Sequence, residues 1–234
     1  MVLPLTKKVA LEFTRIPFNL WRVRVKAECA ARKRLEFSER IASQTMKISI
    51  VTFDDFTDLD LFILWDLLKR VENPDWHVKI LGDKESHLSS TGIEIKMHGQ
   101  LGEANESDAV LFCSGYGTRK KVRDESFLGA FRLDEQKQLI GAIDSGVMLL
   151  GALGLLKGKR ATSYPSAEIK KMLEDAGAEV VWDSFVSEGN VATAAQCLAG
   201  QHLVGWVIER LADAEQKDKV LRSVVPLDFI AVSF

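Results

Sequence analysis

The amino-acid sequence predicts an α/β fold, in which a mainly parallel sheet is covered by helices on both faces. Five short runs rich in apolar and β-branched residues are typical of buried strands: "KISIVTF", "WHVKIL", "DAVLFC", "QLIGAI" and "AEVVW". Helical patterns separate most of these runs, and strands that alternate with helices pair in parallel through right-handed crossovers. We therefore expect one main layered domain that begins at Met46.

The segments between these strands have their own signatures. Residues 58–71, "DLDLFILWDLLKRV", predict a first helix with a broad apolar face. That face consists of Leu59, Phe62, Ile63, Trp65, Leu67 and Leu68. The alternating segment "SSTGIEIKMHG" predicts a short hairpin or edge element, and residues 147–156 predict a buried helix. A second amphipathic helix, "SAEIKKMLEDAG", has a serine cap at its start and a glycine at its end.

Composition bounds the class of protein. The chain has 234 residues, 47% of them hydrophobic and 27% charged, which suits one sizeable core. Its longest apolar run is far shorter than the ~20 residues that cross a bilayer, so we expect no membrane span. Three widely separated cysteines argue against a disulfide framework and favour a reducing cytoplasm. No paired His or Cys spacing predicts a metal site, and no motif predicts a cofactor.

Charge divides the chain unevenly. Residues 1–45 carry ten Lys or Arg against four Glu, whereas the remainder carries 21 basic and 29 acidic residues. A basic amphipathic targeting arm is one interpretation of the extension, but its glutamates favour an accessory helix or an upstream extension. The expected domains are therefore residues 1–45, a main domain over residues 46–212, and an apolar tail over residues 213–234 that packs on the core or on a second subunit.

Three loops follow predicted strands and are candidates for the functional site, because ligands gather at the carboxyl ends of parallel strands. They are "DDFTDLDL", "SGYGTRK" and "DSGVMLL". The second is too short for a phosphate-binding Walker loop and lacks GxGxxG spacing, so its glycines are better explained as backbone N–H donors. The third resembles a strand-to-helix elbow, with Asp144 at the bend and Gly146 allowing a tight crossing.

These segments carry a resemblance to a known family. Four segments resemble motifs of the ThiJ/PfpI superfamily and its isonitrile-hydratase-like branch, in the same order along the chain. They are "FTDLDLFILWDLL", "VLFCSGYGTR", "AIDSGVMLLGALGLLKGKRATSYP" and "VSEGNVATAAQCLAGQHLVGWVIERL". The resemblance covers about residues 46–212. It implies a class I glutamine amidotransferase-like fold, a flavodoxin-like three-layer sandwich, often a homodimer, with a pocket at the elbow that takes a small molecule.

The resemblance also assigns positions to individual residues. The elbow cysteine of the family falls on Asp144, and the acid that hydrogen-bonds it falls on Asp60. The glycine that lends an oxyanion-hole N–H falls on Gly115, and Ser145 follows the nucleophile position. Tyr164 stands where many relatives have a histidine. We expect neither Cys113, which ends another strand, nor Cys197, which precedes the last helix, to replace the missing thiol, and the same holds for Cys29.

Two interpretations of Asp144 stay open. Two carboxyl groups in one partly buried pocket resist simultaneous ionisation, so Asp60 and Asp144 would share a proton and act as acid and base. Such a pair suits hydration or lyase chemistry without a covalent intermediate. Alternatively, Asp144 merely caps the helix that starts at Ser145. A carboxylate nucleophile would need a base to activate water, and no histidine is evident for that task.

The other candidates are binding residues. Ser145 is expected to act as a cap or an oxyanion donor rather than as a nucleophile, since no histidine partner is visible. Tyr116 and Tyr164 are candidate pocket residues, although Tyr164 also suits an ordinary strand end. Arg119 is a candidate anchor for a substrate carboxylate, or it simply begins a helix.

Two functions follow from these observations. The first is a small-molecule hydratase or hydrolase that uses the Asp60/Asp144 pair in place of a cysteine. The second is a catalytically silent relative that binds a metabolite or partner through the same pocket. Protease, glyoxalase and deglycase activities would require the missing cysteine. Nucleic-acid binding has little support, because the core is acidic and its basic residues are dispersed.

Overall fold

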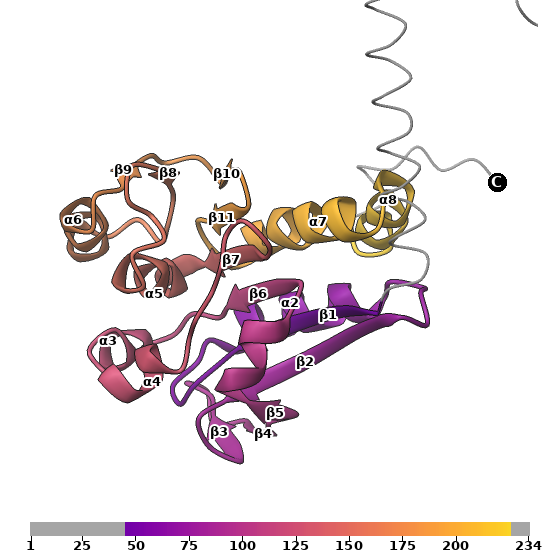
Figure 1. Cartoon of the computed structure of the whole chain (residues 1–234), viewed down its shortest axis with the longest axis horizontal. Helices are drawn as coiled ribbons and strands as arrows, with labels where there is room; N and C mark the ends of the chain where they lie inside the picture. Colours follow the sequence, from indigo (N-terminus) through magenta and orange to yellow (C-terminus); the bar gives the residue numbers. More distant parts are fainter. Residues whose placement is uncertain (1–44, 226–234) are drawn as a thin grey trace, which may run out of the picture. The chain divides into compact units, whose positions relative to one another are not determined.

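The computed structural model describes residues 45–225, and a seven-stranded sheet forms their centre (Figure 1). The strand order is β10-β11-β7-β6-β1-β2-β5. All pairs within this sheet are parallel except β10 with β11, which form an antiparallel hairpin at one edge. The mainly parallel sheet predicted from the sequence is thus confirmed.

The elements follow the predicted alternation. The strands are β1 (Met46–Val51), β2 (Trp76–Gly82), β3 (Ser86–Leu88), β4 (Glu94–Lys96), β5 (Gly99–Gln100), β6 (Ala109–Phe112), β7 (Leu139–Ile143), β8 (Arg160–Ala161), β9 (Glu179–Val180), β10 (Phe185–Glu188) and β11 (Val191–Ala194). The α-helices are α2 (Asp58–Lys69), α3 (Thr118–Lys121), α4 (Glu125–Gly129), α5 (Val147–Ala152), α6 (Ala167–Asp175), α7 (Gly200–Leu211) and α8 (Ala214–Arg222). The 3-10 helices are η1 (Leu101–Glu106), η2 (Asp144–Gly146) and η3 (Cys197–Ala199).

Side chains of the central strands alternate between two apolar layers, which places helices on both faces. On one face, Val110 and Phe112 of β6 join a buried cluster with residues of α4, α5 and α6. On the other, Leu203 of α7 lies directly over Gly141 of β7, where an added Cβ would lie 2.7 Å from its side chain. Helix α7 also packs against α2 (Figure 1). The three-layer arrangement follows from this alternation.

Helix α2 forms where predicted, and its buried face overlaps the predicted apolar face only in part. Asp60, Leu61, Leu64, Leu67 and Leu68 are buried, whereas Leu59 and Phe62, which we predicted on the apolar face, are exposed. The predicted apolar face was correct for Leu67 and Leu68 but wrong for Leu59 and Phe62, because α2 turns its polar first-turn residue Asp60 into the core. Together with residues of α7 and α8, the exposed side chains line a groove of about 910 Å³.

The prediction that "AEVVW" forms a strand of the main sheet was also wrong. Only Glu179 and Val180 form a strand, β9, which pairs with β8 in a separate two-stranded sheet. The β10–β11 hairpin takes the place beside β7 instead, and Trp182 is exposed. The predicted hairpin in "SSTGIEIKMHG" exists as the antiparallel β3–β4 pair. Ser166 lies at the N-cap of α6, although its side chain makes no capping hydrogen bond.

The structure describes neither end of the chain. Residues 1–44 and 226–234 lie outside the described residues, so the predictions for the basic extension and for the last residues of the tail stay predictions. The nearer part of the tail forms α8, which packs against α7 and buries Val220. Over residues 45–225, no helix has the length and apolarity needed to cross a membrane.

The elbow between β7 and α5 depends on the absence of a side chain at Gly146. A Cβ there would lie 2.4 Å from the carbonyl oxygen of Cys113, at the end of the neighbouring strand β6. Such a contact is far inside van der Waals distance, and its partner is backbone that cannot rotate away. The tight crossing predicted for Gly146 is therefore confirmed.

We predict that Gly146→Ala destabilises the protein by about 3 kcal/mol, because the methyl group forces β6 and the elbow apart. Urea unfolding followed by circular dichroism measures this change. The matched control is Gly129→Ala in α4, where an added Cβ meets nothing within 4 Å. The free energy of unfolding of this control should change by less than about 1 kcal/mol. Equal stability of the two variants would contradict the assigned role of Gly146.

Candidate active site

Asp144 occupies the sharpest point of the elbow. Its φ angle is 54°, in the left-handed region that costs a residue with a side chain about 1–2 kcal/mol. The side chain accepts a hydrogen bond from the backbone N–H of Ser145, the very next residue. A helix-capping aspartate instead has an extended backbone and accepts from the second or third helical N–H. The conformation therefore differs from that of a simple cap and is typical of a functional elbow.

Asp60 enters the same site from α2. It lies in the first turn of this helix, where the helix dipole favours negative charge, and it is fully buried. Its Oδ2 accepts a hydrogen bond from the hydroxyl of Ser114, at the end of β6. Its Oδ1 is buried and has no hydrogen-bond partner. One oxygen of a buried carboxyl group is thus left without a partner inside the site.

A cysteine lies beside both acids. One ligand atom each of Asp60, Asp144 and Cys197 lies within 4.8 Å of the other two. The expectation that two acids meet at the elbow is correct, but the expectation that no thiol lies there was wrong. Cys197 begins η3, directly after β11, and the parallel pairing of β11 with β7 brings this turn alongside the elbow. The thiol therefore reaches the site from a different backbone segment.

Burial sets the protonation of all three groups. Burial raises the pKa of Asp144 to about 6; the backbone hydrogen bond from Ser145 opposes this shift, and the nearby Asp60 adds to it. Burial also raises the pKa of Asp60, against smaller opposing contributions from Cys197 and Ser114. Burial, with the Asp60 carboxyl beside it, raises the pKa of the Cys197 thiol to about 12. The thiol is therefore protonated near neutral pH.

Gly115 and Ser145 meet beside the elbow, but their polar groups bond to each other. The N–H of Gly115 donates to the hydroxyl oxygen of Ser145 at 3.3 Å, and that hydroxyl also lies 3.4 Å from the Gly115 carbonyl oxygen. Gly115 has a φ of 149°, and a Cβ there would lie 2.1 Å from the backbone oxygen of Asp55. Glycine is thus required here, although its N–H already has a partner other than a substrate oxygen.

The remaining predicted binding residues lie nearer the surface. The Nε and Nη2 of Arg119 both donate to Glu168, at 3.1 and 2.9 Å. Its positive charge still lowers the pKa of Asp144 slightly. Tyr164 and Tyr116 are 46% and 75% exposed. Arg119 is therefore held by an ion pair rather than free to bind a substrate carboxylate, and Tyr116 lies largely in solvent.

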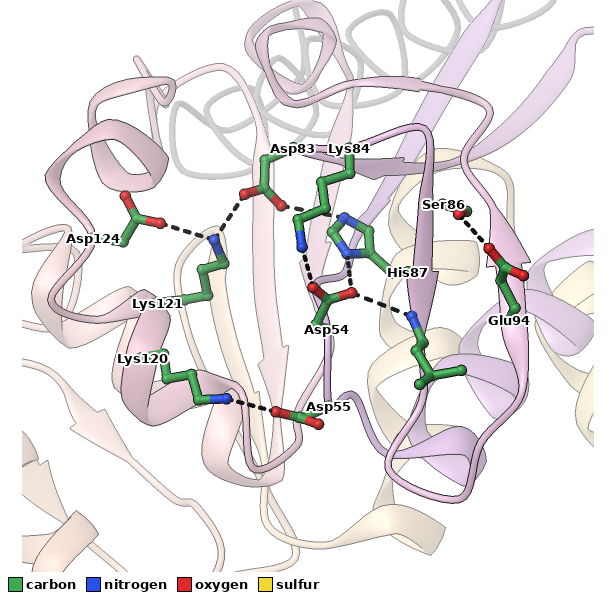
Figure 2. A network of polar contacts seen from close by, with 11 residues as sticks. Asp54, Asp55, Asp83, Lys84, Ser86, His87, Glu94, Lys120, Lys121 and Asp124 are labelled. Atoms are coloured by element: carbon green, nitrogen blue, oxygen red, sulfur yellow. Dashed lines mark hydrogen bonds and ion pairs between the residues drawn. The ribbon is translucent and has the colours of Figure 1, made fainter.

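The first two aspartates of the "DDFTDLDL" loop have a structural role (Figure 2). Asp54 bonds to Lys84 and to the buried His87, whose Nδ1 lies 2.8 Å from its Oδ1. The opposite ring nitrogen of His87 lies 3.2 Å from Asp83. Burial opposes ionisation of Asp54, but the bonds from Lys84 and His87 outweigh it and lower its pKa.

The same network extends to helix α3 (Figure 2). Lys121 lies 2.8 Å from both Asp83 and Asp124, and Lys120 lies 2.8 Å from Asp55. These pairs join the loop after β1 to the segment after β2 and to α3. His87 is a buried histidine with an aspartate beside each of its ring nitrogens. Asp54 and Asp55 therefore hold the frame of the site and do not enter it.

Cys197 is the site residue that the sequence analysis missed. The signal for this residue is its position three residues after the last strand of the closing hairpin, β11, which the structure pairs with the elbow strand β7. A residue immediately after a parallel strand adjacent to β7 ends at the same edge of the sheet as Asp144. The rule that selected the other loops therefore selects this one only once the pairing of β11 with β7 is known.

Comparison with known proteins identifies the family of the chain. The model of the DJ-1/PfpI family matches residues 46–210. The chain belongs to the DJ-1/PfpI family. An isonitrile hydratase of Pseudomonas putida is 29% identical over 156 residues, which cover 66% of this chain and 67% of the relative. A deglycase of Pyrococcus horikoshii is 25% identical over 148 residues, which cover 62% of this chain and 87% of the relative.

Solved structures show the same fold. A ThiJ/PfpI family protein from Pseudomonas syringae superposes with a TM-score of 0.70 at 21% sequence identity. The superposition covers 81% of this chain and 79% of the chain of that protein. This likeness concerns the fold alone. Within the DJ-1/PfpI fold, the elbow residue is Asp144 here, and a cysteine lies one segment away.

We predict that Asp144→Asn changes how stability depends on pH. An acid whose pKa rises on folding binds more protons in the folded state, so the wild type loses stability as pH rises from about 4 to above 6. The amide of the variant cannot ionise. Its free energy of unfolding should therefore rise by roughly 2 kcal/mol relative to that of the wild type between about pH 4 and above pH 6. Urea unfolding at pH 4, 5, 6 and 7 with EDTA measures the difference. Parallel stability curves would contradict the buried position of this carboxyl.

Proposed function

We propose that the protein hydrates a small electrophile of the isonitrile class, with Asp60 and Asp144 as an acid–base pair. The observation that supports this most is the meeting of a buried carboxyl group, Asp60, and a partly buried one, Asp144, both of raised pKa, at a strained elbow. The similarity to an isonitrile hydratase supports the substrate class. Because two adjacent carboxylates repel, one proton is shared between them near neutral pH.

The reaction follows from this shared proton. The protonated carboxyl group donates its proton to the terminal carbon of the isonitrile, which makes that carbon electrophilic. The ionised partner accepts a proton from a water molecule as the water oxygen attacks the same carbon. The product rearranges to an N-substituted formamide, and the pair again holds one proton. Neither a covalent intermediate nor a thiolate takes part.

Cys197 has a supporting role in this mechanism. A nucleophilic cysteine must be a thiolate, and the raised pKa of Cys197 keeps it protonated. As a neutral neighbour, the thiol fills space beside the buried Asp60 without adding a further negative charge. Deglycase chemistry of the cysteine type is therefore not the function that we propose.

One observation favours the alternative of a silent binding protein. The N–H of Gly115 and two nitrogens of Arg119 already have partners within the protein. A site that binds a ligand without turning it over needs no free donor for developing charge. Under this alternative the pocket is retained and the chemistry is lost.

We predict that the wild type converts cyclohexyl isocyanide to N-cyclohexylformamide, and that Asp144→Asn and Asp60→Asn each lower kcat by about 100-fold or more. The matched control is Asp55→Asn. It makes the same chemical change at a residue that also has a left-handed backbone, with φ of 60°, but bonds to Lys120 outside the pair. Gas chromatography of the formamide measures turnover.

The outcomes separate the two functions. The acid–base mechanism is supported if the wild type and Asp55→Asn are active while Asp60→Asn and Asp144→Asn are not. Full activity in Asp144→Asn would overturn it. A wild type that binds the isonitrile in calorimetry but never forms formamide would support the silent alternative instead.

A further inference from the structure

Asp60, Asp144 and Cys197, which we call the elbow pocket, carry the types of side chain that bind metal ions. Asp60, Asp144 and Cys197 each offer one ligand atom, and these atoms lie within 4.8 Å of one another. Two carboxylate oxygens and one sulfur suit borderline cations such as Zn²⁺, whereas Mg²⁺ and Ca²⁺ prefer oxygen alone. Three protein ligands leave a fourth tetrahedral position for water.

A second observation points to a ligand at this position. Asp60 is completely buried, and its Oδ1 has no hydrogen-bond partner. Buried polar atoms are nearly always paired, and leaving one unpaired is costly. Its other oxygen accepts a hydrogen bond from the hydroxyl of Ser114, and one oxygen of this carboxyl group lies within 4.8 Å of the ligand atoms of Asp144 and Cys197. A buried carboxylate oxygen without a partner inside the protein points to a ligand that bonds to it.

The acidic cluster of Figure 2 shows the contrast. Its carboxylates, Asp54 and Asp83, already face the ammonium groups of Lys84 and Lys121. In the elbow pocket, the charged groups that act on Asp144 are the acid Asp60 and, on the far side, Arg119, which is itself paired with Glu168. Among these two clusters, only the elbow pocket has excess negative charge without a close cation.

We propose that the elbow pocket binds one thiophilic divalent cation, best matched by Zn²⁺, through Asp60, Asp144 and Cys197. Ligand bonds of about 2.0–2.3 Å hold neighbouring ligands about 3.3–3.6 Å apart, so side-chain rotation within the observed 4.8 Å limit closes the site. Binding deprotonates the thiol and displaces the proton held by the carboxyl pair, and both protons leave to solvent.

The consequence for activity depends on the proposed function. Acid–base hydration needs the proton of the pair, and a bound cation takes its place. Zn²⁺ is therefore an inhibitor of the hydration reaction, and a chelator restores the activity. Binding itself does not depend on the reaction, so the two proposals can be tested separately.

The experiment uses the full chain after EDTA treatment, titrated with Co²⁺ as a spectroscopic substitute for Zn²⁺. We expect about one equivalent to bind, with thiolate-to-cobalt absorption in the near ultraviolet and tetrahedral bands in the visible. Cys197→Ser should abolish the ultraviolet band, and Asp144→Asn should weaken Co²⁺ binding by about tenfold or more. The matched control is Cys29→Ser, which lies outside the described residues and should keep the full spectrum.

Several results decide the proposal. No thiolate band in the wild type, or a band that persists in Cys197→Ser, overturns it. Should Cys197→Ser fail to fold, the wild type alone still gives an answer: Zn²⁺ should protect Cys197 from iodoacetamide in peptide mass spectra, and equal labelling with and without Zn²⁺ overturns the site.

Activity then separates this proposal from the proposed function. A cobalt band together with no formamide production supports the cation site and refutes the hydratase. Formamide production that Zn²⁺ leaves unchanged, together with no cobalt band, refutes the cation site and leaves the hydratase intact. Activation by Zn²⁺ overturns both the inhibition and the metal-free mechanism.

Discussion

The close crossing of the elbow over strand β6 is the constraint on which the site depends. With Gly146 seated against the carbonyl of Cys113, the chain has no room to turn gradually from β7 into α5. The turn is completed within one residue, Asp144, whose backbone is left-handed as a result. The surrounding packing maintains this strained conformation, and it directs the Asp144 side chain toward α2 and η3 rather than into the sheet.

Burial of like charges gives the pocket its chemistry. Asp60 is withdrawn from water on α2, where the helix dipole and Ser114 favour its ionised form only in part. Asp144 joins it from the elbow and Cys197 from the end of β11. Each group makes ionisation of the others less favourable, so the pocket retains protons that exposed aspartates would lose. Any species that replaces those protons must itself carry positive charge.

Much of the architecture could be predicted from the sequence, because short-range patterns determine it. Runs of β-branched residues located the strands of the central sheet, and the "DSG" bend located the elbow. The predicted apolar face of α2 was only partly correct, because periodicity does not reveal which side meets the sheet: Leu67 and Leu68 are buried, whereas Leu59 and Phe62 are exposed. Cys197 was missed because its place beside Asp144 depends on the pairing of two strands about 50 residues apart, which local patterns do not report.

The origins of the three pocket residues along the chain also bear on how the protein folds. Asp60, Asp144 and Cys197 come from the first, middle and last thirds of the described residues and meet only when β11 has paired with β7. Such pairing closes long loops, and contacts of this separation form late and slowly. A nascent or partly folded chain therefore has no pocket at all, and its thiol is not shielded by burial. The chemical environment of Cys197 thus reports on completion of the last strand pairing during folding.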